Sequence, residues 1–185
     1  MPSATQAAHD WRQREGYFER FLRGRGIDIG CGDSPVTPIC DCWDLERGDS
    51  DAQAMTGAPV ESYDFVYSSC CLEHLGDAKA ALVRWWELVK PSGYLLVTVP
   101  DEDLYEQGHW PSIFATDHRW TFTLYKAQSW SPASLNVIEF DLLLPGAEVV
   151  WVKRFDHGYD YEGGVWDRTA KGAEAYIEFL ARKRA

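Results

Sequence analysis

Basic residues are scarce in this chain of 185 amino acids. Lys and Arg together number 18, against 29 for Asp and Glu, which gives a formal net charge of −11 at neutral pH. A surface with this balance repels the phosphates of nucleic acids and the headgroups of anionic lipids. The composition therefore predicts neither nucleic acid nor a membrane surface as a partner.

Long apolar runs are also missing. A membrane-spanning helix needs about 18 consecutive apolar residues, and even the apolar region 137–152 is interrupted by acidic residues, Pro145 and Gly146. Residues 1–10 contain no basic segment followed by an apolar one, so no secretory signal is expected. These two absences predict a soluble protein in the cytoplasm.

Cysteines are few and odd in number, and their spacing matches no common metal site. All five lie in the first half of the chain: Cys31, Cys40, Cys42, Cys70 and Cys71. A chain of this length forms a core without disulfides, so we expect reduced thiols that pack as small apolar residues. Neither the close pair Cys40 and Cys42 nor the adjacent pair Cys70 and Cys71 has the spacing of a zinc ribbon, so no metal site is expected.

The remaining composition is that of a globular protein. Hydrophobic residues make up 45% and charged residues 25% of the sequence, which suffices for a core. No repeat or low-complexity linker divides the chain, so we expect one domain over residues 1–185. Its expected parts are a leading helix in 1–24, a ligand-binding core in 25–100, an insertion in 101–133 and C-terminal helix and strands in 134–185.

The pattern of apolar residues predicts an α/β fold. Expected strands are Gly26–Ile29, Ile39–Trp43, Tyr63–Tyr67, Tyr94–Val99, Glu148–Phe155 and Ala173–Leu180, and expected helices are Asp10–Leu22, Asp77–Lys90 and Ser134–Leu144. Strand, helix and strand with short connections form a parallel unit, so we predict a Rossmann-like, mostly parallel sheet with helices on both faces and an antiparallel terminal strand. Ligands of such sheets bind outside the carboxyl ends of the strands.

Residues Ile27-Asp28-Ile29-Gly30-Cys31-Gly32-Asp33, at the end of the first predicted strand, resemble a nucleoside-binding loop. Asp44 follows Asp28 by 16 residues, and later segments follow in a fixed order: Asp51-Ala52-Gln53, Glu61 to Val66, Leu72-Glu73-His74, and Leu88 to Leu95. This ordered set resembles the class I S-adenosylmethionine-dependent methyltransferases, in particular small-molecule enzymes with a type 11-like methyltransferase domain. The resemblance spans residues 26–123 and implies S-adenosylmethionine as cofactor.

The resemblance implies a set of cofactor-binding residues: Asp28, Gly30, Cys31, Gly32, Asp44, Asp51, Ala52 and Ser69. Glycine at positions 30 and 32 allows close approach of a ligand because it has no Cβ atom. The Asp44 carboxylate can accept hydrogen bonds from ribose hydroxyls, and that of Asp51 can accept from an adenine amino group. Taken singly, each aspartate could equally be a solvated loop residue.

A dinucleotide-binding oxidoreductase is the main alternative, and the sequence argues against it. Such a loop needs a third glycine and a helix whose N-terminus holds a pyrophosphate, but Pro35 occupies the third position. Ile39 follows Gly32 by only 7 positions, so the helix that normally follows the first strand must be shortened. A ligand without phosphate tolerates this loss.

The acceptor of the methyl group is expected beside the insertion that follows Val99. His118 and His109 are the candidate catalytic residues, because a general base is needed if the acceptor carries a proton. Each histidine could instead order its loop by bonding to the backbone. The sequence thus predicts methyl transfer to an O, N or C atom of a small molecule, with a non-catalytic subunit that binds S-adenosylmethionine as the alternative.

Overall fold

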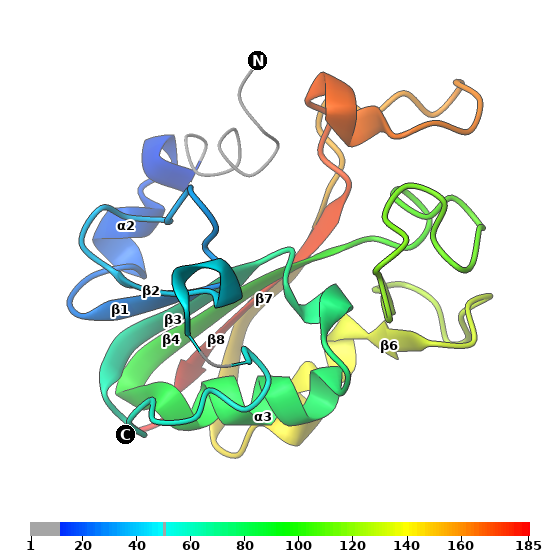
Figure 1. Ribbon diagram of the computed structural model, residues 1–185. Helices are drawn as coiled ribbons and strands as arrows, with labels where there is room; N and C mark the ends of the chain where they lie inside the picture. Colours follow the sequence, from blue (N-terminus) through cyan, green and yellow to red (C-terminus); the bar gives the residue numbers. More distant parts are fainter. Residues whose placement is uncertain (1–11, 50) are drawn as a thin grey trace.

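A six-stranded β-sheet organises the computed structural model, which describes residues 12–49 and 51–185 (Figure 1). Its strands, in spatial order, are β2 (Asp41–Trp43), β1 (Gly26–Ile29), β3 (Tyr63–Ser69), β4 (Val89–Pro100), β8 (Tyr176–Lys183) and β7 (Ala147–Phe155). The first four are parallel to one another, whereas β8 runs antiparallel to both β4 and β7. This topology confirms the predicted fold class, and it places the carboxyl ends of four parallel strands at one edge.

Helical segments cover both faces of the sheet, as Figure 1 shows for α3 (Ala78–Leu88) and α2 (Tyr17–Arg20). The Asp77 side chain accepts the Ala80 N–H and so begins α3, whose apolar face packs into the main core with Trp85 fully buried. On the other face, Tyr17 and Phe21 pack against Phe65 of β3. The helix predicted over Asp77–Lys90 is therefore confirmed, but it ends two residues earlier.

The leading helix is not continuous as predicted over Asp10–Leu22. Residues 12–14 are helical, a turn follows, and α2 begins only at Tyr17 because Gly16 has a left-handed φ of 73°. Glycine adopts this conformation without steric cost, which breaks the helix at that point. The predicted start at Asp10 lies outside the described residues.

The second half of the chain also differs from prediction. The predicted helix Ser134–Leu144 is instead the short strand β6 (Ser134–Asn136) followed by the 3₁₀ helix η3 (Val137–Leu143). β6 pairs in parallel with β5 (Thr121–Thr123), so backbone pairing with the insertion overrides the local helical pattern. The predicted terminal strand is present, but it begins at Tyr176 and not at Ala173.

Three further 3₁₀ helices complete the described elements: η1 (Leu45–Arg47), η2 (Leu72–His74) and η4 (Arg168–Lys171). A shortened helix was predicted between β1 and β2 because of Pro35 and Pro38. The described chain forms only turns and bends there and no helix. Within the described residues, no helix is long and apolar enough to cross a membrane.

Candidate functional site

The loop after β1 turns sharply at Gly30. The Gly30 N–H donates to the Trp43 carbonyl over 2.9 Å, and its φ of 76° lies in the left-handed region. A Cβ atom at this position would lie 2.7 Å from the Cβ atom of Cys71. Glycine is therefore required at position 30 because a side chain would clash with the loop that follows β3. The sequence suggested only that a ligand must approach closely there.

Gly32 has a different environment from Gly30. Apart from its own chain neighbours, no atom of the described residues lies within 4 Å of the position its Cβ would take, and its φ is 47°. Its N–H donates to Asp44 Oδ2 over 2.9 Å, and its carbonyl accepts from Arg47 Nη2 over 2.9 Å. The backbone of Gly32 is thus fixed on one side and open on the other, which leaves room for a ligand.

Asp44 lies at the end of β2 and holds two backbone segments together. Its Oδ1 accepts the Glu46 N–H, which caps η1, while its Oδ2 accepts the Gly32 N–H. A carboxylate offers about four lone-pair positions, and these two bonds occupy only half of them. The half-buried side chain therefore keeps the capacity to accept hydrogen bonds from a ligand.

Asp28 is buried within β1, 2% exposed, and its Oδ2 accepts the Val36 N–H over 2.7 Å. Burial raises the pKa of Asp28 to about 7, although that hydrogen bond and the charge of Arg12 act in the opposite direction. Asp28 thus fixes the far end of the glycine loop. Cys31 is buried between the two glycines, and burial raises the pKa of its thiol, which disfavours the reactive thiolate.

The other predicted cofactor residues surround the same strand ends. Asp51 is exposed, and its Oδ1 accepts the Gln53 N–H. The side chain of Ala52 packs into the core, and its carbonyl accepts from Trp85 Nε1. Ser69, at the end of β3, accepts a hydrogen bond from Thr98 Oγ1 over 2.8 Å.

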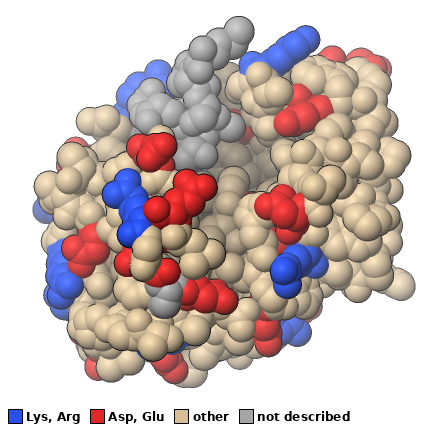
Figure 2. Space-filling model, in the orientation of Figure 1, with Lys and Arg blue, Asp and Glu red and all other residues tan. Residues whose placement is uncertain are grey.

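A cavity of about 520 Å³ lies beyond the ends of β3 and β4. Its walls come from the loop after β3, the insertion, the N-terminal segment and the segment that precedes β8. They include Arg14, Cys70, Glu73, His74, Pro100, Tyr105, Ala115, His118, His157, Thr169 and residues 172–176. Figure 2 shows this side of the molecule hollowed near its centre, with acidic side chains on both sides of the hollow.

His118 reaches this cavity from the insertion. Its ring is 8% exposed, stacks on Tyr105 with 5.3 Å between ring centroids, and places Nδ1 2.8 Å from Glu106 Oε1. Burial lowers the pKa of His118, but the hydrogen bond with Glu106 and the charge of Glu73 outweigh it, so that the pKa is raised. His109, the other predicted catalytic residue, is exposed and does not line the cavity.

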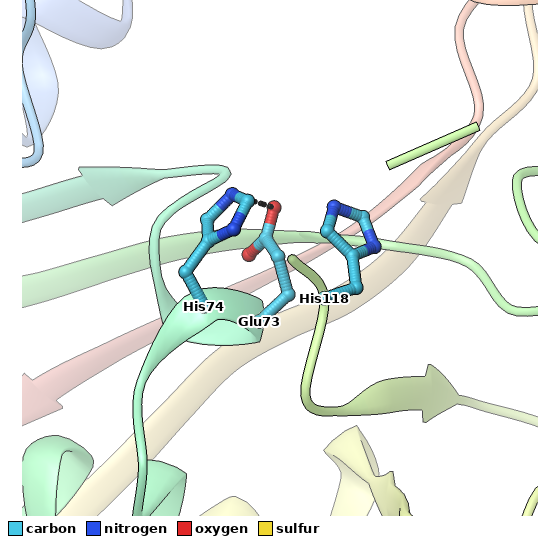
Figure 3. A group of neighbouring side chains, drawn as sticks. All are labelled: Glu73, His74 and His118. Carbon is cyan, nitrogen blue, oxygen red and sulfur yellow. Dashed lines mark ion pairs between the residues drawn. The ribbon is translucent and has the colours of Figure 1, made fainter. Parts of the chain in front are cut away.

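Glu73 and His74 come from η2 and stand beside His118 in the cavity wall (Figure 3). Glu73 is 1% exposed, and burial raises its pKa to about 8. The rings of His74 and His118 meet edge to face with centroids 4.9 Å apart, and burial lowers the pKa of His74 against the opposing charge of Asp117. This wall is therefore polar, and the raised pKa of Glu73 favours its uncharged form at neutral pH.

Sequence analysis missed several residues of this wall. Glu106 lies 12 residues before its partner His118, a spacing that indicates no contact in an irregular segment. The segment before β8 reaches the cavity only because β8 inserts between β4 and β7. The one available signal was Glu73 and His74, two polar residues between Leu72 and Leu75 in a segment that also belongs to the ordered set of the family resemblance.

Comparison with known proteins gives a consistent result. The sequence profile of a family described as "Methyltransferase domain" matches residues 4–133. No curated protein sequence matches this chain at a significant level.

Solved structures share the fold at low sequence identity. A SAM-dependent methyltransferase from Archaeoglobus fulgidus superposes with a TM-score of 0.62 at 15% identity, covering 98% of this chain and 95% of the other. The YcgJ protein from Bacillus subtilis gives 0.60 at 12% identity, covering 96% and 99%. The [4+2]-cyclase SpnF gives 0.58 at 15% identity, covering 100% and 83%. At these identities the likeness shows the fold.

Proposed function

The chain belongs to the methyltransferase-domain family, and from this premise we propose that it transfers a methyl group from S-adenosylmethionine to an O, N or C atom of a small molecule. The observation that carries the proposal is the arrangement at the carboxyl ends of the parallel strands. There the glycine loop and Asp44 follow β1 and β2, a partly open cavity follows β3 and β4, and Cys71, next to the cavity residue Cys70, approaches Gly30 closely.

The residues at the ends of β1 and β2 fit the nucleoside part of this cofactor. The open side of Gly32 allows close approach, and Asp44 keeps free acceptor positions for ribose hydroxyls. Asp51 is exposed and presents a carboxylate for the adenine amino group. When bound, S-adenosylmethionine supplies a methyl group on a positively charged sulfur, which makes that carbon electrophilic.

Four other residues complete the proposed cofactor site. Asp28 holds the loop through Val36, Cys31 lies buried between the glycines, and Ser69 is the last residue of β3, directly before the cavity residue Cys70. Ala52 contributes through its backbone, because its side chain belongs to the core. None of these groups reacts; together they position the cofactor.

The cavity is the proposed site of the methyl acceptor. Its volume of about 520 Å³ falls within the 300 to 1,000 Å³ usual for small-molecule sites. Glu73 and His74 make one wall polar. We propose that the acceptor contacts His118, whose Nδ1 is held by Glu106 so that Nε2 is the ring nitrogen left for the cavity.

Methyl transfer places few demands on the protein beyond position. The reaction is an in-line displacement, so holding the two reactants together supplies most of the rate increase. Tyr105 stacks on His118 and thereby fixes the ring that faces the acceptor. Activation of a protonated acceptor is the one chemical step that needs a polar residue.

Mass-spectrometric detection of methylated product tests the function. The purified chain is incubated with S-adenosylmethionine and a panel of metabolites that includes amines, phenols and carboxylic acids. Product that appears only with active protein and in proportion to S-adenosylhomocysteine supports the proposal. Tight binding of S-adenosylmethionine without product from any acceptor favours the alternative, a non-catalytic partner subunit. The structural likeness to the [4+2]-cyclase SpnF illustrates that a similar fold occurs in a protein named for a different reaction.

A further inference from the structure

Three potential metal ligands converge in the cavity wall. Glu73, His74 and His118 each place one ligand atom within 4.8 Å of those of the other two. Figure 3 shows the Glu73 carboxylate between the two imidazole rings, with His74 from the same turn of η2 and His118 from the insertion. Residues that are 45 positions apart in the sequence thus form one group.

The Glu73 carboxylate is the feature that the fold alone does not explain. It is 1% exposed, and within the described residues neither of its oxygens has a hydrogen-bond partner. Removing an ionised carboxylate from water without donors costs several kcal/mol, so buried carboxylates are normally paired or bind a cation. In the described part of the chain, the only basic side-chain atom within 4.0 Å of the Glu73 carboxylate is His74 Nε2, 4.0 Å from Oε1, and burial lowers the pKa of that histidine.

Two further carboxylates orient the histidines. His118 Nδ1 lies 2.8 Å from Glu106 Oε1, and His74 Nδ1 lies 3.0 Å from Asp117 Oδ2. Metal-binding histidines usually donate one ring N–H to a carboxylate, which leaves the other nitrogen with a lone pair for the metal. His118 has this hydrogen bond, whereas His74 Nδ1 lies within ion-pair distance of Asp117 without forming a hydrogen bond in the described residues. The Nε2 atom is the ring nitrogen left for a metal in each.

We propose that Glu73, His74 and His118 bind one divalent transition-metal ion, of the Zn²⁺ and Co²⁺ class, through one carboxylate oxygen and the two Nε2 atoms. Two imidazoles and a carboxylate are a ligand set that such ions prefer, whereas Mg²⁺ and Ca²⁺ prefer oxygen alone. The three ligand atoms now lie within 4.8 Å of one another. Since two ligands of one ion lie about 3 Å apart, movement of the side chains alone brings them to coordination distances.

The site leaves part of the coordination sphere open to the cavity. Three protein ligands are typical of metal sites that retain a position for water or substrate, and all three residues line the cavity. With an ion bound, Nε2 of His118 would be a metal ligand, and the open position of the ion would take the place of the direct contact between His118 and the acceptor proposed above. The cysteine spacing gave no indication of this site. Its three ligands come from two segments that are distant in the sequence, so no spacing of residues predicts it.

Cobalt provides a direct test that needs no methyl transfer. The chain is stripped with a chelator and titrated with Co²⁺ while visible absorption is recorded. We expect bands that saturate at one equivalent, with weak intensity typical of nitrogen and oxygen ligands, and their loss when Zn²⁺ is added. A strong near-ultraviolet band from thiolate ligation would locate the ion at the cysteines and overturn the proposal, as would an absence of saturable binding.

Matched variants locate the ion. Glu73→Gln keeps the shape of the side chain and should weaken Co²⁺ binding at least tenfold, and Glu106→Gln, which leaves all three ligands in place, should weaken it by about 10- to 100-fold. His109→Ala, an exposed histidine of the same insertion, should bind Co²⁺ as the parent does. Circular dichroism checks that each variant is folded. If Glu73→Gln does not fold, the Co²⁺ affinity of Glu106→Gln tests the site. Equal affinities for parent and Glu106→Gln would contradict the site.

The result is independent of the proposed function. Binding of S-adenosylhomocysteine without Co²⁺ binding would reject the metal site and leave the methyltransferase intact. Co²⁺ binding without affinity for S-adenosylhomocysteine would support the metal site and reject the proposed function.

Discussion

The glycine loop and the cavity wall lie at the same edge of the sheet but are built in different ways. The loop belongs to one stretch, 28–47, and is closed by bonds between its own members, such as Gly32 with Asp44. The cavity wall gathers residues as distant as Arg14 and Tyr176. The comparison teaches that the glycine-loop part of the proposed donor site is built locally, whereas the proposed acceptor site depends on the complete tertiary fold.

Replacement of His118 should give the largest effect and should be confined to the acceptor side. We expect His118→Ala to lower kcat/KM by a factor on the order of 10² to 10⁴, while the affinity for S-adenosylmethionine stays within about threefold. The physical reason is that His118 lines the cavity and touches none of the residues proposed to hold the cofactor. Product formation is measured at matched concentrations of folded protein.

The parallel variant His109→Ala sharpens this test, because both histidines were candidates and only one lines the cavity. A loss of turnover in His109→Ala equal to that in His118→Ala would show that the cavity is not the acceptor site. Unchanged turnover per folded molecule in His118→Ala would remove that residue from the mechanism.

Two glycine variants compare close packing with open space within the glycine loop. Gly30→Ala should lower the free energy of unfolding by about 3 kcal/mol, because strain at positive φ adds to a clash with Cys71. Gly32→Ala should cost about 1 kcal/mol, since only the backbone conformation opposes it. Denaturant unfolding measures both, and equal losses would mean that the contact between Gly30 and Cys71 does not hold the two regions together.

Asp44→Ala should act mainly on the donor. Loss of a charged acceptor for the ribose hydroxyls should weaken S-adenosylmethionine binding by about 1.5 to 3 kcal/mol. Part of this loss comes from the Gly32 N–H, which also loses its acceptor. Asp44→Asn separates the two contributions, because it retains an oxygen for Gly32 but not the charge. If Asp44→Ala binds the donor as tightly as the parent, the ribose assignment is wrong.

Asp28 predicts a gradual effect, a pH dependence of stability. Its pKa of about 7 in the folded protein lies above the ordinary value of 3.8, so between about pH 4 and 7 the folded state holds a proton that the unfolded state has lost. The contribution of Asp28 to stability therefore falls as the pH rises through this window, by at most about tenfold in the folding equilibrium per pH unit.

Asp28→Asn should remove that slope. The groups that act on Asp28 are the Val36 N–H and the charges of Arg12 and Asp44, all of which the variant retains. Denaturant unfolding at pH 5, 6 and 7 gives the difference between parent and variant, which cancels the titration of other groups. A constant difference across this range would contradict a raised pKa for Asp28.

Prediction from sequence succeeded where neighbouring residues decide the structure. The strand Gly26–Ile29 was predicted with its observed bounds, because a short apolar run and a glycine turn leave little choice. The helix over Asp10–Leu22 failed at Gly16, whose left-handed backbone the apolar pattern does not reveal. The pair formed by Glu106 and His118 depends on how the insertion folds, which no spacing in that segment indicates.

Titration calorimetry with S-adenosylhomocysteine and NADH tests the central claim most directly, since the claim is that a local loop recognises a phosphate-free nucleoside independently of the cavity. We expect the parent and His118→Ala to bind S-adenosylhomocysteine with affinities within about threefold of each other, Asp44→Ala to bind it roughly 10- to 150-fold more weakly, and NADH to give no heat with any of them. Saturable binding of NADH, or equal affinity of Asp44→Ala and the parent for S-adenosylhomocysteine, would contradict the account.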